Sequence, residues 1–531
     1  MREPPSSIEI LDSTLREGLQ AVGVSLSVED RIKLALLLDE VGVHFIEGGW
    51  PGAAEADRTF LRRAKQMGLG AKIAAFTSTR RRELSADSDP ILAAVLDVEP
   101  DVVVVFGKTW DLHVRVVLGA TLEENLEIVR DTVEFFRRQG LAVVFDAEHF
   151  FDGYKENRDY ALAVVRAAAE AGAETVVLAD TNGGSLPHEV YFVTRETVEE
   201  LRPLGARVGV HAHNDSGCAV ANTLMAVMAG AEHAQVTVNG VGERCGNADL
   251  AAVVANLELK MGVRALRRPE GLTKLTQLSL LFYELAGLSR NPFQPYVGEN
   301  AFAHKAGVHV DAVLKCPRTY EHIDPERVGN KRRLVVSQLS GRAALLALAS
   351  QLGIDVSKSD PRLARALEKI KRAEVEGAGL EESQASVALT LLKEYGAYSP
   401  RFELIEWSVE TGPGRARARA RVRAGSRVVE AESDGVGPVH AVDLAVRRAL
   451  EEVAPEVARV KLVDYRVSLL GAPKSTSSVV KVAMVLTDGE RAWTSGCAST
   501  NIVEASVRAL VEGLDYYLHL LSKGSAEARE S

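Results

Sequence analysis

Short apolar runs alternate with helix-like segments over the first half of the chain, from Ile8 to about Lys260. Val28–Val41 shows helical spacing of its apolar residues, and Ser27 before it is a favourable N-cap residue. Eight strand–helix units over roughly 250 residues favour an α/β fold, a closed (β/α)8 TIM barrel. A doubly wound open sheet is the alternative, but it seldom has eight such regular units. The predicted strands are Ile8–Leu11, Val43–Ile46, Ala71–Phe76, Val102–Phe106, Leu141–Phe145, Thr175–Leu178, Val208–Val210 and Ala234–Val238.

The pattern changes twice further along the chain. Residues 266–397 are mostly helical in pattern, and alternating strands appear after Ser399-Pro400. Phe402–Val409 and Leu462–Leu469 each begin a strand, strand, strand, helix series, which indicates an internal βββα repeat. The sequence therefore predicts a barrel at 1–265, a helical connector at 266–397 and a C-terminal α+β domain at 398–531.

Composition narrows the function classes. A hydrophobic content of 46% supports large buried cores, and a net charge of −10 argues against a nucleic-acid partner. The strictly alternating run Arg415–Arg423 could be a basic arm, but the solvated face of an antiparallel strand is the favoured interpretation. Four scattered cysteines without Cys-x-x-Cys spacing suit a reducing cytoplasm. Neither a secretion signal nor a membrane-spanning apolar stretch is read, so we expect a cytoplasmic protein without a membrane partner.

Polar residues collect where the predicted strands end, which is the end of a TIM barrel that carries chemistry. His211 and His213 close the seventh strand, and because strand residues i and i+2 face the same side, both imidazoles can reach one metal ion. Two hydrogen-bonded histidines at a strand end are the alternative. The other strand-end residues are Asp12 and Arg16 after the first strand, Glu47 at the second, Glu148 at the fifth, Asp180 and Thr181 at the sixth, and Asn239 at the eighth.

Asp12 is a hard oxygen ligand that can converge with the histidines, since only the eighth strand separates the first from the seventh. Asn247, in the glycine-rich segment after the eighth strand, could add a carbonyl oxygen. Two nitrogens and one carboxylate with open positions suit Mg²⁺, Mn²⁺ or Zn²⁺. A structural zinc site would normally close with four protein ligands.

Other residues could bind substrate or move protons. Arg16 could hold a carboxylate or steady an enolate, or could only form a salt bridge with Glu17 or Glu47. Glu148 and His149 are candidate proton carriers.

Several motifs together resemble the isopropylmalate/citramalate/homocitrate synthase family over almost the whole chain. Gly48–Gly52 and Phe145–Gly153 are most similar to the citramalate branch, and the C-terminal repeat resembles the family's regulatory, dimerising domain. The motifs are Asp12–Gln20, Ile46–Gly52, Ala179–Gly184, His211–His213, Gly240–Asn247, Ala306–Ala312 and Ser499–Ala505.

The resemblance implies an acyltransferase that condenses acetyl-CoA with a 2-oxo acid and then hydrolyses the thioester. The citramalate branch implies pyruvate as the 2-oxo acid, in isoleucine biosynthesis. The isopropylmalate branch, with 2-oxoisovalerate in leucine biosynthesis, is the nearest rival, and homocitrate synthesis is less favoured. A metal-dependent carbon–carbon lyase or a non-catalytic sensor would leave parts of the chain without a use. A homodimer and an amino-acid effector at the C-terminal domain are implied as well.

The resemblance also implies roles for individual residues. One sequence difference is Glu17, where many relatives have aspartate. By matching motifs, Asp12, His211, His213 and Asn247 would hold a divalent metal, Arg16 would stabilise the enolate and bind the 2-oxo acid, Glu47 would fix Arg16, Thr181 would contact the substrate carboxylate, Glu148 would be the base or orient it, and His309 and Tyr320 would assist from the connector.

Overall fold

The computed structural model describes residues 4–334, 342–357, 359–375, 383–470, 477–489 and 491–530. It divides into two compact units, Met1–Phe302 with His322–Arg332, and Ala303–Glu321 with Arg333–Ser531. Parts of the predicted connector, at 335–341, 358 and 376–382, lie outside the described residues. The predicted segment boundaries at 265 and 397 stay predictions.

The first unit is built on a closed parallel barrel, which confirms the predicted fold class. Each strand pairs with the next, and β1 closes the ring by pairing with β8, with Ile10 opposite Ala234. The strands are β1 (Glu9–Asp12), β2 (Phe45–Glu47), β3 (Lys72–Ser78), β4 (Val102–Lys108), β5 (Ala142–Glu148), β6 (Thr175–Asp180), β7 (Arg207–Ala212) and β8 (His233–Val236).

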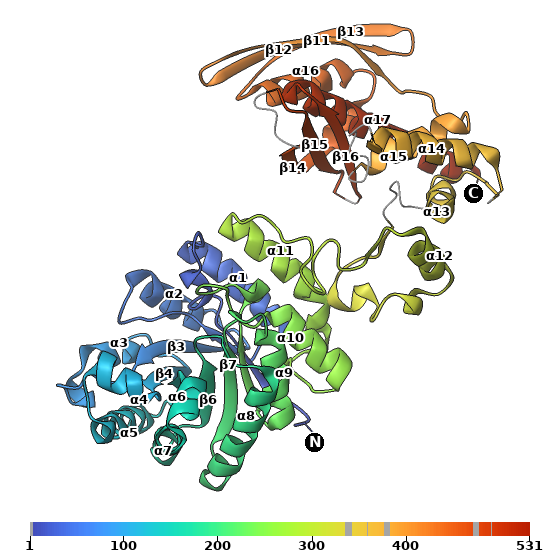
Figure 1. Cartoon of the computed structure of the whole chain (residues 1–531). Coiled ribbons are helices and arrows are strands. Elements are labelled where there is room, and N and C mark those ends of the chain that lie inside the picture. Colours follow the sequence, from blue (N-terminus) through green and yellow to red (C-terminus); the bar gives the residue numbers. More distant parts are fainter. Residues whose placement is uncertain are drawn as a thin grey trace. The chain divides into compact units, whose positions relative to one another are not determined.

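Helices cover the outside of this barrel (Figure 1). Local sequence fixes their ends: Ser27 accepts a hydrogen bond from the Asp30 amide at the start of α1, and Thr121 and Glu124 form a capping box. The helices of the barrel are α1 (Val28–Val41), α2 (Glu55–Gln66), α3 (Pro90–Leu96), α4 (Asp111–His113), α5 (Leu122–Arg138), α6 (Phe150–Glu156), α7 (Arg158–Glu170), α8 (Pro187–Leu201), α9 (Ala219–Ala229) and α10 (Leu250–Asn256), and α11 (Leu275–Ala286) follows them.

Two hydrophobic layers hold the barrel together. Side chains that alternate along the strands point either into the barrel or outward against the helices, as strand geometry requires. The interior residues are Leu11, Phe45, Ala74, Phe76, Val102, Val104, Val144 and Val177.

The second unit begins with short elements and continues into the predicted repeat. Two antiparallel three-stranded sheets, each followed by a helix, confirm the βββα pattern. The first elements are β9 (Ala303–His304), α12 (Gly307–Lys315), β10 (Arg333–Leu334), α13 (Arg342–Gln351), α14 (Pro361–Val375) and α15 (Gln384–Glu394). The repeat comprises β11 (Glu403–Gly412), β12 (Arg415–Ala424), β13 (Arg427–Gly435) and α16 (Pro438–Leu450), then β14 (Lys461–Leu469), β15 (Val480–Thr487), β16 (Ala492–Ser499) and α17 (Ile502–Glu530).

The alternating arginines of β12 are explained by this sheet. Ala416, Ala418, Ala420 and Val422 are buried in the core that β12 shares with α16, while the arginines between them are exposed. Three of the arginines pair with acidic residues of the flanking strands, namely Arg417 with Glu432, Arg419 with Glu430 and Arg423 with Glu403. The run is therefore a solvated sheet face, as favoured from its sequence.

All four cysteines are free thiols. None of the helices that the structure describes combines the length and the apolar character needed to cross a bilayer.

Candidate active site at the barrel rim

A cavity of about 460 Å³ opens where the barrel strands end. Its lining combines an aromatic wall with charged and imidazole side chains from several different strands. Arg16, Glu148, Thr181, His211 and His213 all line it, so the structure brings these predicted residues to one cavity.

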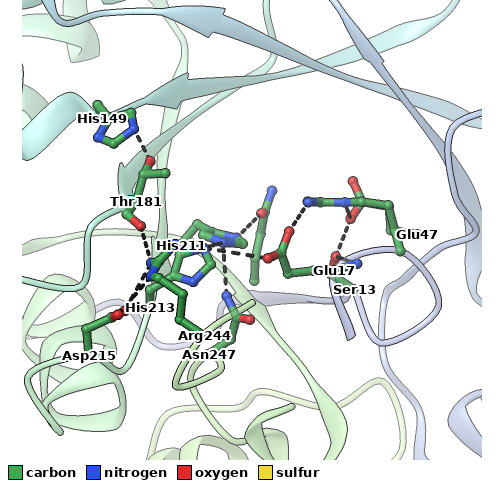
Figure 2. A network of polar contacts seen from close by, with 12 residues as sticks. Ser13, Glu17, Glu47, His149, Thr181, His211, His213, Asp215, Arg244 and Asn247 are labelled. Atoms are coloured by element: carbon green, nitrogen blue, oxygen red, sulfur yellow. Dashed lines mark hydrogen bonds and ion pairs between the residues drawn. The ribbon is translucent and has the colours of Figure 1, made fainter. Parts of the chain in front are cut away.

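His211 and His213 lie at the end of β7 with their Nε2 atoms 3.3 Å apart (Figure 2). Gln235 Nε2 donates to Asp146 Oδ1 at 2.8 Å, so Gln235 Oε1 is the atom that faces His211 Nδ1, at 2.7 Å. His211 Nδ1 must therefore carry the proton, and its Nε2 lone pair points toward His213. Burial, with a contribution from His213, lowers the pKa of His211 to about 3, which keeps the imidazole neutral.

Glu17, rather than Asp12, supplies the carboxylate beside these imidazoles. One ligand atom each from Glu17, His211 and His213 lies within 4.8 Å of the others. The Asp12 carboxylate is not part of this group, and it accepts hydrogen bonds from the Thr14 amide at 3.1 Å and the Thr14 hydroxyl at 2.8 Å. The structure thus differs from the sequence-based ligand set at this residue.

The two carboxyl groups also differ in charge. Burial raises the pKa of Asp12 to about 7, and Glu47 adds to the rise. Burial alone would raise the pKa of Glu17 as well, but Arg16, together with His211, His213 and the backbone of Glu243, outweighs burial, and the pKa is lowered. Glu17 is therefore the better anionic ligand at neutral pH.

Asn247 completes the group. Its Nδ2 lies 3.1 Å from His211 Nε2, while its Oδ1 is buried without a hydrogen-bond partner in the described part of the chain. A half-turn of the amide would exchange these two atoms and aim the oxygen at the imidazoles. Converging imidazole lone pairs, an ionised carboxylate and an unpartnered amide oxygen fit a divalent cation.

Arg16 lies between two carboxylates. Its Nε donates to Glu47 Oε2 at 2.8 Å, its Nη1 pairs with Glu17, and its guanidinium carbon lies 3.9 Å from the centre of the Phe76 ring. Burial would lower the pKa of Arg16, but Glu47 and Glu17 outweigh it and raise the pKa. The site therefore holds a fixed positive charge at the cavity wall.

Glu148 is the last residue of β5, and Thr181 directly follows β6. Glu148 forms an ion pair with Lys108, the last residue of β4. The Thr181 hydroxyl oxygen accepts from the His149 amide at 2.8 Å, and the Thr181 carbonyl accepts from Arg244 at 2.7 Å (Figure 2). Within the described part of the chain no acceptor is assigned to the Thr181 hydroxyl hydrogen, so this group can donate to a ligand.

Trp50, Phe76 and Phe106 form the apolar wall of the cavity. Trp50 packs edge-on against both phenylalanines, with ring centroids 5.9 and 5.7 Å apart. Two glycines before Trp50 allow this packing: a Cβ at Gly48 would lie 2.5 Å from Leu61, and Gly49 has a φ of +120° and would meet Asp57. The Trp50 amide donates to Asp57 Oδ2 at 2.8 Å, which anchors the wall to α2.

His309 and Tyr320 belong to the second unit. Their rings stack with centroids 4.0 Å apart, and both side chains are exposed. Their assistance at the barrel site stays a prediction.

Sequence reasoning missed several residues of the site, among them the aromatic wall of Trp50, Phe76 and Phe106. Lys108 ends β4 and could have been found by the strand-end rule used for the other strands. Asp146 precedes Glu148 by two residues and so faces the same side of β5. Glu17 and Gln235 had no such signal as ligand and orienting residue, because their roles depend on a local turn and on a neighbouring strand.

Comparison with known proteins identifies the class that this fold and site define. Residues 7–281 match the HMGL-like family, residues 296–377 the homocitrate synthase post-HMGL domain-like family, and residues 381–518 the LeuA allosteric (dimerisation) domain. The chain belongs to the HMGL-like/LeuA family. HMGL-like proteins are typically metal-dependent, and the Glu17–His211–His213 group agrees with that property.

Full-length relatives refine the comparison. The chain is 49% identical to an (R)-citramalate synthase of Sulfolobus acidocaldarius, covering 96% of this chain and 97% of that protein. It is 45% identical to an (R)-citramalate synthase of Aquifex aeolicus, covering 96% and 98%. A probable 2-isopropylmalate synthase of Methanopyrus kandleri is more distant, at 38% identity over 96% and 98%.

Proposed function

We propose that the protein is an (R)-citramalate synthase, which condenses acetyl-CoA with pyruvate and hydrolyses the thioester to give citramalate and free CoA. The arrangement that carries the proposal is the group of Glu17, His211 and His213 beside the buried Arg16, in a cavity with an aromatic wall. The full-length similarity to (R)-citramalate synthases supports the choice of pyruvate.

A divalent ion, Mg²⁺, Mn²⁺ or Zn²⁺, would be held by Glu17, His211, His213 and Asn247. When bound, it would supply Lewis-acid polarisation of the 2-oxo acid carbonyl. Gln235 contributes by fixing the His211 tautomer, so that Nε2 is free to act as a ligand.

Arg16 and Thr181 would bind the 2-oxo acid. The Thr181 hydroxyl can donate to the carboxylate, and the fixed guanidinium of Arg16 can stabilise the oxygen on which negative charge develops. Glu47 keeps the guanidinium in place through the 2.8 Å contact to its Nε. Trp50, Phe76 and Phe106 offer an apolar surface that suits a methyl group and restricts a branched side chain.

Glu148 would act as the base. It takes a proton from the methyl group of acetyl-CoA, and the resulting carbanion attacks the keto carbon of pyruvate, whose oxygen gains the electron pair and then a proton. Water then adds to the thioester carbonyl, and the CoA thiolate leaves and is protonated. Lys108 holds Glu148 in position at the cavity edge. His309 and Tyr320 would assist this chemistry, as the family resemblance implies.

The C-terminal repeat would serve regulation and assembly. The LeuA allosteric (dimerisation) match over residues 381–518 supports a homodimer and an amino-acid effector bound at this domain. Removing the chain after Ala397 should abolish feedback inhibition, and inhibition that persists in the truncated protein would contradict this role.

Release of free CoA thiol, measured with a panel of 2-oxo acids, tests the proposed function. We expect pyruvate to give the highest kcat/KM and treatment with a chelator to abolish turnover until a divalent ion is restored. A clear preference for 2-oxoisovalerate would favour 2-isopropylmalate synthase, the second candidate, which the Methanopyrus kandleri relative supports. Full activity in chelated, metal-free protein would contradict the mechanism.

A further inference from the structure

We propose that His113, Glu148 and His149 form a second divalent-cation site at the barrel rim, selective for zinc-like transition metals. The site shares no residue with the Glu17–His211–His213 group. Occupation of the site would engage Glu148 and so inhibit turnover, and this inhibitory effect rests on the proposed function.

The donor atoms of this site converge. One ring nitrogen from each histidine and a carboxylate oxygen of Glu148 lie within 4.8 Å of one another. Donors around a tetrahedral Zn²⁺ with bonds of roughly 2.1 Å lie about 3.4 Å apart, so side-chain rotations alone can close the group around an ion. Two imidazoles and one carboxylate favour zinc-like ions over Mg²⁺, which prefers oxygen ligands.

His149 is oriented as metal-binding histidines are. Its Nδ1 lies 3.0 Å from Asp152 Oδ2, and that carboxylate oxygen also accepts from Asn182 Nδ2 at 3.1 Å. With Nδ1 donating to a carboxylate, the lone pair is on Nε2. The residue adopts a left-handed φ of +55°, which non-glycine residues rarely do, and the hydrogen bond from its amide to Thr181 helps to hold it there.

His113 is positioned by stacking. Its ring lies against Trp110, with centroids 5.2 Å apart and an interplanar angle of 17°, and 4.2 Å from the His149 ring. Its Nδ1 is buried and has no hydrogen-bond partner among the described residues. Buried ring nitrogens normally have a polar partner, so this imidazole is available to a ligand.

Lys108 limits the affinity of the site. Its ammonium group already pairs with Glu148, so an incoming cation must compete with it. We therefore expect the site to fill only when metal is in excess over the Glu17–His211–His213 site, which gives the two sites distinguishable occupancies.

Metal counting on the full chain tests the site without reference to catalysis. Equilibrium dialysis against Co²⁺ should give two bound ions per wild-type chain and one in His113→Gln. His188→Gln, which alters an exposed histidine on α8, is the matched control and should keep two. Asp152→Asn should keep two ions at saturation but weaken the second by roughly 10- to 100-fold. Two ions in His113→Gln with unchanged affinity in Asp152→Asn would overturn the site.

Inhibition by Zn²⁺ tests whether filling the second site slows turnover. With the first site filled, excess Zn²⁺ should slow CoA release on the order of a hundredfold in wild type and in His188→Gln, since it removes a proton-transfer group. The ratio of rates with and without excess Zn²⁺ should return toward one in His113→Gln. A second bound ion without inhibition would overturn the predicted effect on turnover. A protein that is inactive on pyruvate would contradict the proposed function, and the number of bound ions would then still test whether the second site exists.

Discussion

Arginine–glutamate pairs occur both in the barrel and in the C-terminal sheet, but their surroundings differ. The Arg16 side chain is 9% exposed and that of Glu47 is fully buried, whereas Arg419 and Glu430 on the sheet are 57% and 41% exposed. In water, an ion pair gains little because solvent already stabilises both charges. In the barrel, removing one partner would leave the other charged and buried. Burial therefore separates a functional charge cluster from a solvated surface.

The largest expected effect is at Arg16. Arg16→Ala leaves Glu17 and Glu47 without their cation, so we expect a loss of about 3–5 kcal/mol in the free energy of unfolding and a fall in kcat of roughly 100-fold or more. Denaturant unfolding and the CoA-release assay measure the two effects. Arg16→Lys keeps the charge and should recover stability more than activity. Turnover at the wild-type rate in Arg16→Ala would show that the buried ion pair of the barrel is no more functional than the exposed pair on the sheet.

The next effect separates two buried carboxyl groups within the barrel. Glu17→Gln should lose its metal on dialysis, because the anionic ligand is removed, whereas Asp12→Asn should retain it. Metal analysis of the two purified variants is the measurement. Retention in Glu17→Gln with loss in Asp12→Asn would restore the ligand set expected from sequence.

A smaller effect concerns two histidines away from the cavity, His233, which is fully buried, and His44, which is partly buried. Burial lowers the pKa of His233 to about 3 and that of His44 to about 4, from an ordinary value of 6.5. Their contribution to stability is present above pH 6.5 and is lost as pH falls through these lowered values, because the unfolded chain binds the protons first. Each group should add up to about 1.4 kcal/mol per pH unit to the slope of the free energy of unfolding against pH.

His233→Leu should reduce that slope and leave the His44 contribution in place. His233 is fully buried beside Phe45, and neither of its ring nitrogens has a hydrogen-bond partner among the described residues, so an apolar replacement is tolerable. Urea titrations between pH 4 and 7 measure the slope. An identical slope in the variant would show that His233 is not the titrating group.

The smallest effect is expected on the sheet. Arg419→Ala should leave the unfolding midpoint and its salt dependence unchanged within measurement precision, because the charge is exposed to solvent and screened. A destabilisation comparable to that of Arg16→Ala would show that exposure does not separate the two regions.

The fold could be predicted from the sequence because its signals are periodic and local. Eight apolar runs and the helical segments between them predicted the barrel, and the alternating sequence of β12 predicted a strand with one solvated face. The strand-end rule also led to Arg16, Glu148, Thr181 and both histidines, all of which line the cavity.

The choice between Asp12 and Glu17 could not be predicted by that rule. Asp12 is the strand-end residue, and its carboxylate accepts two hydrogen bonds from Thr14. The turn that follows places the Glu17 carboxylate beside the imidazoles of His211 and His213. Side-chain competition within a short turn leaves no periodic signal. The left-handed backbone conformation of His149 could not be predicted either, because this conformation usually falls on glycine and the sequence has a histidine there.

The paired glycines before Trp50 have a consequence for how the substrate preference of this protein could be changed. A Cβ at Gly48 would force the Leu61 and Phe60 side chains of α2 to move, and at Gly49 it would meet Asp57 in a backbone conformation that side chains rarely adopt. If the aromatic wall selects the acceptor as proposed, the easier change is exchange of one ring for a smaller residue on an unaltered backbone. Selection for a bulkier 2-oxo acid should enrich substitutions at Trp50, Phe76 or Phe106 and leave both glycines intact.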